Sequence, residues 1–207
     1  GYQSKLICQY LSRYWHMLSV VLARPISGRV SPDKPLAAAT AMAQNVVRRK
    51  KAQKSKMKRK LMGMTEASWL MLETKNRPMH VASLLVYSLP KGAPKNYLRD
   101  LVSELRETTE FADPFNRKLF YPELMPFVTA IPFWGEDHDL DLEYHVRHLS
   151  LPEPGGEREL GILISRLHSN PMDLSRPLWE YHVIEGLENN RFAVYFRMHH
   201  SIVDGMS

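Results

Sequence analysis

Two strand-like runs near the end of the chain constrain its fold more than any other feature. "LWEYHVIEGL" and "RFAVYFRMHH" are rich in β-branched and aromatic residues, and only "ENN" separates them. A short, turn-prone connection between two such runs is typical of a β-hairpin. We therefore predict two antiparallel strands, and the apolar composition of both runs predicts that their sheet is largely buried.

The preceding residues alternate between helical and strand patterns. Apolar residues repeat at helical spacing in some segments, and other segments are apolar or alternating, as in strands. The helix predictions cover 65–72, where Thr65 is the expected cap, 97–111, where Asn96 is the expected cap, and 157–170, and the strand predictions cover 79–89 and 142–151. The segment 111–141, rich in proline and aromatic residues, is predicted to form long connections. The fold class predicted is α/β, a mixed sheet flanked by helices.

Charge divides the chain into two pieces. Residues 1–61 carry 14 lysines and arginines against one acid, Asp33, whereas residues 62–207 carry 14 against 21 acids. The overall charge of +6 conceals this contrast, so we predict a basic N-terminal extension at 1–61 and a separate globular part at 62–207. The single cysteine, Cys8, excludes a disulfide within the chain and fits a reducing compartment.

The N-terminal extension supports several interpretations. The apolar residues of 6–22 have helical spacing and predict a helix with a broad apolar face. Three interpretations are open: the helix packs on a partner, it lies on a membrane surface, or these residues come from an overextended reading frame. No uninterrupted apolar stretch is long enough to predict a membrane span. Residues 48–60 hold nine basic side chains, a pattern that fits a solvated tail or an anionic lipid surface. No aromatic residues interleave this run, so we expect no nucleic-acid binding.

The second strand of the hairpin leads into a group of residues suited to catalysis. His199 and His200 end the strand-like run, and Asp204 and Gly205 follow closely. A histidine at a strand end has a near-neutral pKa and a rigid position, as a general base requires. In a continuing strand the two histidines point to opposite faces, which argues against a shared metal ion, so we predict no metal site. The alternative is that both histidines only satisfy hydrogen bonds in a core.

The stretch "HHSIVDG" matches the HHxxxDG motif of the coenzyme A-dependent acyltransferase superfamily, which is similar in fold to chloramphenicol acetyltransferase. "ASW" and "PMHV" in the segment 64–89, and "PLW" at Pro177, Leu178 and Trp179, resemble the bacterial wax ester synthase/diacylglycerol acyltransferase family. The resemblance covers residues 62–207, and residues 1–61 have no counterpart in it.

The resemblance implies the following roles. His200 would be the general base that takes the hydroxyl proton of a diacylglycerol or long-chain alcohol, whose oxygen then attacks the thioester of acyl-CoA. Asp204 would hold the loop through an arginine partner, Gly205 would keep the turn tight, and His199 would belong to the motif with a less defined role. Pro177, Leu178 and Trp179 would shape either the substrate channel or the fold around it. Acyl-CoA would be a co-substrate, and no resident cofactor is implied.

The resemblance also implies a second, similar subdomain that carries further motifs, and these are absent from the 207 residues. We therefore expect the chain to be the N-terminal half of a longer enzyme and to be inactive or nearly so alone. The expected location is cytoplasmic, peripherally associated with the inner membrane or lipid inclusions. The alternatives are a condensation-type domain that shares HHxxxDG and a non-catalytic module that binds lipid surfaces.

Overall fold

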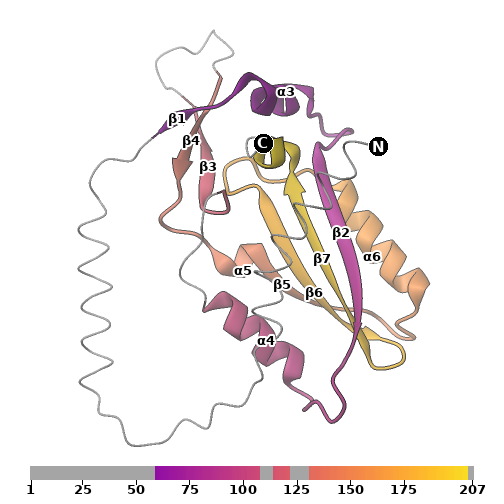
Figure 1. Cartoon of the computed structure of the whole chain (residues 1–207). Coiled ribbons are helices and arrows are strands. Elements are labelled where there is room, and N and C mark those ends of the chain that lie inside the picture. The colour runs from indigo at the N-terminus through magenta and orange to yellow at the C-terminus, as the bar shows by residue number, and fades with distance from the viewer. Residues whose placement is uncertain (1–58, 108–113, 122–130, 205–207) are drawn as a thin grey trace, which may run out of the picture. The chain divides into compact units, whose positions relative to one another are not determined.

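Figure 1 shows a computed structural model of the chain, which describes residues 59–107, 114–121 and 131–204. The side chains of residues 203 and 204 are not described. Most of the predicted N-terminal extension, with its apolar helix and basic run, and Gly205 therefore lie outside the described residues. The described elements form a four-stranded sheet in the order β2-β7-β6-β5 and a three-stranded sheet in the order β1-β4-β3.

The predicted hairpin is confirmed at the centre of the larger sheet. Strands β6 (Trp179–Leu187) and β7 (Arg191–His199) are antiparallel, with Val183 opposite Val194. Asn189 and Asn190 form the turn with φ of 61° and 53°. Asparagine tolerates this left-handed conformation better than other residues with a side chain, and two such positions in succession match the twist of a hairpin.

The hairpin has a different kind of neighbour on each side. β2 (His80–Ser88) is antiparallel to β7, as the apolar run at 79–89 predicts, and β5 (Val146–Ser150) is parallel to β6. The strand prediction for 142–151 is correct only for its second half. Residues 142–145 form a helical turn, α5 (Leu142–His145), because the Asp141 carboxylate accepts a hydrogen bond from the backbone N–H of Tyr144 at 3.2 Å.

Helices flank the larger sheet as predicted (Figure 1). α6 (Glu157–Ser169) packs its apolar residues against Ile184, Ala193 and Tyr195 of β6 and β7. α4 (Tyr97–Arg106) buries Leu98, Leu101 and Val102. Asn96 does occupy the N-cap position of α4, although its side chain accepts no capping hydrogen bond. The mixed α/β class with flanking helices is therefore confirmed.

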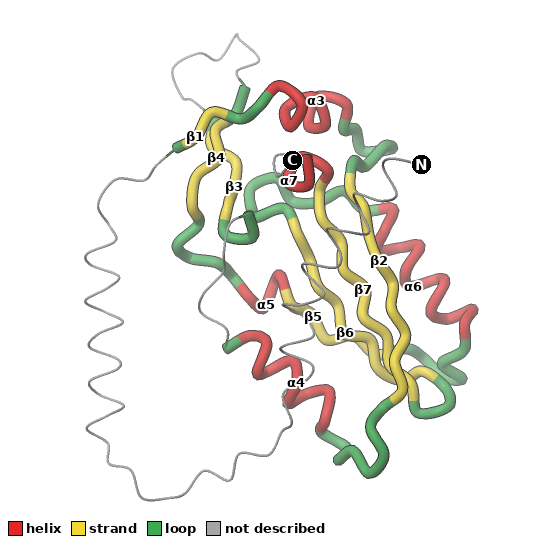
Figure 2. Tube along the Cα trace, in the orientation of Figure 1, coloured by secondary structure: helices red, strands yellow, loops and turns green. Residues whose placement is uncertain are grey.

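The segment 111–141 contains two strands that the sequence analysis assigned to connections. β3 (Arg117–Phe120) pairs with β4 (Phe133–Glu136), and β4 also pairs with β1 (Lys60–Leu61) (Figure 2). The prediction was wrong because these strands are too short to show a clear period of two. Their stability comes from tertiary packing, in a cluster that contains Met62, Ala67, Leu119, Trp134, Leu178 and Ile202.

Two further helices, α3 (Met64–Leu72) and α7 (His200–Asp204), lie close together. α3 begins before Thr65, so the prediction of Thr65 as its cap is wrong. The helix instead starts after Gly63, whose N–H donates to the Glu66 carboxylate at 2.8 Å. The same carboxylate accepts a hydrogen bond from the Trp134 indole N–H at 3.0 Å, which ties α3 to β4. None of the helices in the described residues has the length and hydropathy of a membrane-spanning segment.

Candidate active site

The two adjacent histidines occupy a strand-to-helix turn. β7 ends at His199, and His200 is already the first residue of α7. The expectation of a strand that continues through both histidines is therefore wrong at His200. The backbone N–H of His199 donates to the carbonyl of Leu178 at 3.0 Å, and that of His200 donates to the carbonyl of Met79 at 2.9 Å. Neighbouring chain segments on both sides thus hold the turn in place.

His199 is completely buried, and burial favours its neutral form. Its Nδ1 lies 3.1 Å from the backbone N–H of Ser201 and 2.7 Å from the Ser201 hydroxyl. A backbone N–H can only donate, so Nδ1 is an acceptor and the ring proton is on Nε2. Burial lowers the pKa of His199 to about 4, and the nearby imidazoles of His200 and His80 add to this effect. Ser201 thus selects one tautomer of a histidine that stays uncharged near neutral pH.

The protonated Nε2 of His199 faces a carboxyl group. Oε2 of Glu73 lies 3.3 Å away, although the direction is poor for a hydrogen bond. Burial raises the pKa of Glu73, and a weak hydrogen bond from the Met79 N–H to its other oxygen, at 3.4 Å, partly opposes that rise. Both pKa shifts favour the neutral forms, so we interpret this contact as one between a neutral imidazole and a buried carboxyl group. An ion pair would need both groups to be charged.

His200 differs from His199 in its environment. Its side chain is half-buried, and its ring stacks on the indole of Trp69 with centroids 4.3 Å apart and planes 15° apart. Of the two histidines, His200 is therefore the one that a reacting group can approach from outside the core. Asp204 ends α7 one helical turn after His200.

Leu178 and Trp179 are buried directly beside this turn, and Pro177 precedes them. Leu178 is fully buried in the cluster that includes Ile202 of α7. The Trp179 indole N–H donates to the carbonyl of Phe115 at 2.8 Å, and its ring stacks on His145. Since the Leu178 carbonyl also holds the backbone of His199, this segment supports the end of β7.

A buried polar network that the sequence did not predict lies two residues before the histidines. Arg197 and Glu180 face each other across β7 and β6, with Nη2 of Arg197 2.8 Å from Oε1 of Glu180. His182 lies 3.0 Å from the other Glu180 oxygen. Although burial opposes ionisation, these hydrogen bonds lower the pKa of Glu180 to about 2. The available signal was the presence of Glu180 and Arg197 within two strands that are largely apolar.

Arg197 connects this network to a helix. Its Nη1 donates to the carbonyls of Leu167 and Asn170, at 2.5 and 2.7 Å, where α6 ends. A positively charged group at the C-terminal end of a helix satisfies carbonyls that lack partners within the helix. The strand that ends at His199 is therefore attached to α6 as well as to β6.

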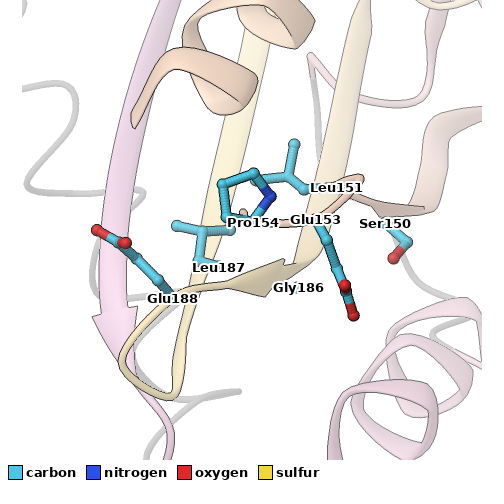
Figure 3. A pocket seen from close by; sticks show the side chains of 7 residues that line it. All are labelled: Ser150, Leu151, Glu153, Pro154, Gly186, Leu187 and Glu188. Atoms are coloured by element: carbon cyan, nitrogen blue, oxygen red, sulfur yellow. The ribbon is translucent and has the colours of Figure 1, made fainter. Parts of the chain in front are cut away.

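An open cavity of about 740 Å³ lies at the other end of β6 and β7 from the histidines. Its lining comes from the end of β5, the β5–α6 connection and the end of β6, namely Ser150, Leu151, Glu153, Pro154, Gly186, Leu187 and Glu188 (Figure 3). None of the predicted site residues lines it. Within the described residues, no three His, Cys, Asp or Glu side chains are close enough together to hold a metal ion.

Comparisons with known proteins give a consistent result. Residues 62–207 match the wax ester synthase/diacylglycerol acyltransferase catalytic domain. A Mycobacterium tuberculosis protein named for diacylglycerol O-acyltransferase activity is 46% identical over 144 residues, covering 70% of this chain and 28% of that protein. The O-acyltransferase WSD of Acinetobacter baylyi is 43% identical over 140 residues, covering 67% of this chain and 28% of that protein.

A solved structure agrees with these sequence matches. The wax ester synthase/diacylglycerol acyltransferase from Marinobacter aquaeolei VT8 superposes with a TM-score of 0.64 at 44% identity. The match covers 70% of this chain and 34% of that one. The chain therefore spans about a third of the length of the relatives it matches.

Proposed function

The chain belongs to the wax ester synthase/diacylglycerol acyltransferase family, and from this premise we propose that it carries the general base for acyl transfer in the whole protein. The acyl donor is acyl-CoA, and the acceptor is a diacylglycerol or a long-chain alcohol. The products are then a triacylglycerol or a wax ester, together with free coenzyme A. No resident cofactor takes part.

One observation carries the assignment of His200 as the base. Of the two motif histidines, His199 is buried, and its Nδ1 accepts a hydrogen bond from the N–H of Ser201. His200 is half-buried, and it lies on a turn that two backbone hydrogen bonds anchor. A general base has to reach the hydroxyl it deprotonates and has to keep a stable position. His200 meets both requirements.

The reaction needs no covalent acyl-enzyme. The imidazole of His200 takes the acceptor's hydroxyl proton while the hydroxyl oxygen forms a bond to the thioester carbonyl carbon. The C–S bond then breaks, and the coenzyme A sulfur leaves with the proton that His200 returns. Holding both substrates beside one base accounts for much of the acceleration in reactions of this kind.

His199 and Asp204 then serve the geometry of the turn. His199 supports the first residue of α7 through its contacts with Ser201 and Glu73. Asp204 stabilises the loop after α7 by pairing with an arginine, and Gly205 allows that loop to turn tightly. Pro177, Leu178 and Trp179 maintain the wall behind β7 or line the substrate channel.

We also propose that the protein works at an anionic lipid surface, peripherally on the cytoplasmic side of the inner membrane or on lipid inclusions. Exposed apolar side chains at and around α3 support this proposal: Leu61, Met64, Met71 and Leu72, which are 50–70% exposed. Met64 and Met71 share a helix face because they are two turns apart. Within residues 59–79, Glu66 is buried and the Glu73 side chain is only 7% exposed, while the exposed cations are Arg59, Lys60, Lys75 and Arg77.

The catalytic proposal is tested on the full-length protein by the release of coenzyme A thiol from palmitoyl-CoA. We expect release that depends on hexadecanol or diolein and that is lost in His200→Ala. His138→Ala, at an exposed histidine, is the matched control and retains full activity. Activity that survives in His200→Ala would exclude His200 as the base. A folded wild type that accepts only carrier-protein-bound substrates would favour the condensation-type alternative.

The lipid-surface proposal has its own test, flotation of the full-length protein with vesicles that contain phosphatidylglycerol. We expect Met64→Gln/Met71→Gln to reduce the bound fraction several-fold. Ile162→Gln, at an exposed apolar residue of α6, should leave binding unchanged. If the double variant floats like the wild type, α3 is not the docking face. If the double variant floats like the wild type but no longer releases coenzyme A thiol, α3 contributes to the reaction and not to lipid binding.

A further inference from the structure

The ring of Trp69 lies almost parallel to that of His200, with the centroids 4.3 Å apart and the planes 15° apart. We propose that Trp69 is the positioning residue of His200, and that its indole face both orients the imidazole and stabilises the imidazolium formed during acyl transfer. This inference rests on the proposed role of His200 as general base. It adds a residue of α3 to the reaction, whereas the motif residues proposed above lie on β7 and α7.

Orientation follows from the packing of α3. Trp69 lies on a helix whose neighbouring residues are held firmly, because Ala67 is buried and Glu66 is hydrogen-bonded to Trp134 of β4. The backbone of His200 is anchored to Met79. The ring of His200 still has two rotatable bonds, and a flat surface parallel to it favours one ring plane. The base is thereby held ready before the acceptor arrives.

Charge stabilisation follows from the chemistry of the step. When the acceptor's O–H bond breaks and an N–H bond forms on His200, the neutral imidazole becomes a cation. A cation over the face of an indole, within about 6 Å of the ring centroid, is attracted by the negative electrostatic potential of that face. The interaction is stronger in the transition state than in the ground state, as a contribution to rate requires.

Burial favours the neutral form of the described titratable groups close to the motif histidines on β7, β2 and α3. On β7, His199 is kept neutral by burial, and on β2, His80 has its pKa lowered to about 4 by burial. At the end of α3, burial raises the pKa of the Glu73 carboxyl group. Asp204 lies on α7 itself, and its side chain is outside the described residues. The proposal rests on the stacked geometry of the Trp69 and His200 rings.

The test compares Trp69→Met and Trp69→Phe in the full-length protein. Methionine fills the space without a ring, and phenylalanine keeps a ring with a weaker cation interaction. For Trp69→Met we expect the plateau kcat to fall about 2- to 30-fold, the range that corresponds to a cation–ring interaction. The acidic limb of the pH profile of kcat/KM should move to lower pH, since the imidazolium is less stabilised. KM for palmitoyl-CoA should stay unchanged, and Trp69→Phe should be intermediate.

A second readout does not depend on activity. Titration of histidine rings labelled with carbon-13 at Cε1, with the His200 signal assigned from its loss in His200→Ala, should show the same direction of change. Tyr87→Leu is the matched control, because it removes a stacked ring pair with Phe192 at the other end of β2 and β7. It should change neither the pH profile nor the His200 titration.

The outcomes separate this inference from the proposed function. If His200→Ala stays active, the proposed function fails. If His200→Ala is inactive but Trp69→Met keeps the wild-type plateau and pH profile, only the role of Trp69 is overturned. A loss of thermal stability with unchanged profile and titration would also overturn it, since that result marks a purely structural residue. If Trp69→Met does not fold, Trp69→Phe decides alone: a shift in the same direction supports the role, and no shift overturns it.

Discussion

His80 of β2 and His199 of β7 lie directly opposite each other at the end of the sheet, and both side chains are buried. Burial lowers the pKa of each to about 4, and the neighbouring Arg197 and His168 also lower the pKa of His80. Neither ring accepts a proton readily in the folded state. The pair therefore makes the stability of the folded chain depend on pH at the end of the sheet next to His200.

We predict that stability falls as the pH is lowered from about 6.5 towards 4. Between these pH values the histidines of the unfolded chain become protonated, whereas the buried histidines of the folded chain stay neutral. The stability that the neutral histidines contribute is therefore fully present above about pH 6.5 and is lost below it. The loss is up to about 1.4 kcal/mol per pH unit for each histidine. Urea unfolding at pH 7, 6 and 5 measures this effect. His80→Leu should remove about a third of the pH dependence, because the buried His145, whose pKa burial also lowers, contributes beside His80 and His199. The exposed His138→Leu control should remove none, and equal slopes in both variants would contradict the prediction.

Glu180 and Arg197 should behave as a mutually dependent pair. Replacing either one alone, by Glu180→Leu or Arg197→Met, leaves the other as an uncompensated buried charge, and we expect a loss of about 3–5 kcal/mol. The double variant should recover a large part of this loss. Recovery should be incomplete because the carbonyls of Leu167 and Asn170 lose their donor. Unfolding of all four proteins forms a double-mutant cycle, and additive losses would refute the pairing.

Gly155 should tolerate no side chain, whereas Gly92 should tolerate one at modest cost. Both have positive φ, of 73° and 75°, so alanine is strained by a similar amount at each. A Cβ at Gly155 would lie 1.9 Å from the backbone oxygen of Gly186, while one at Gly92 would meet nothing within 4 Å. We expect Gly155→Ala to cost about 3 kcal/mol or more and Gly92→Ala about 1 kcal/mol. Thermal and urea unfolding of the two variants would test this, and similar losses would show that the Gly186 contact relaxes freely.

Trp179→Phe should separate the two roles open to the segment 177–179. The substitution removes the indole donor to the buried Phe115 carbonyl, and we expect a loss of about 1–3 kcal/mol in stability. If the residue serves the fold alone, the relative rates with acyl-CoA substrates of different chain length stay as in the wild type. Rates measured in the full-length protein check this. A changed chain-length preference would place Trp179 in the substrate channel.

The amino-acid sequence by itself determined the features whose signals are local. The hairpin of β6 and β7, the flanking helices and the HHxxxDG motif are all read from consecutive residues, because periodicity, turn chemistry and motif spacing act over a few positions. The short strands β3 and β4 escaped prediction because their pairing depends on packing against α3 and α7.

Only the tertiary structure decided how the two histidines differ. The two histidines are adjacent in the sequence, and the strand pattern predicts only that their side chains point to opposite faces of the sheet. The chain instead changes from strand to helix between them, since the carbonyls of Leu178 and Met79 hold the two amides. Ser201 and Glu73 then enclose His199, and Trp69 provides a surface for His200. Glu73 and Trp69 come from a segment remote in sequence, and contacts between distant segments depend on how the whole chain packs.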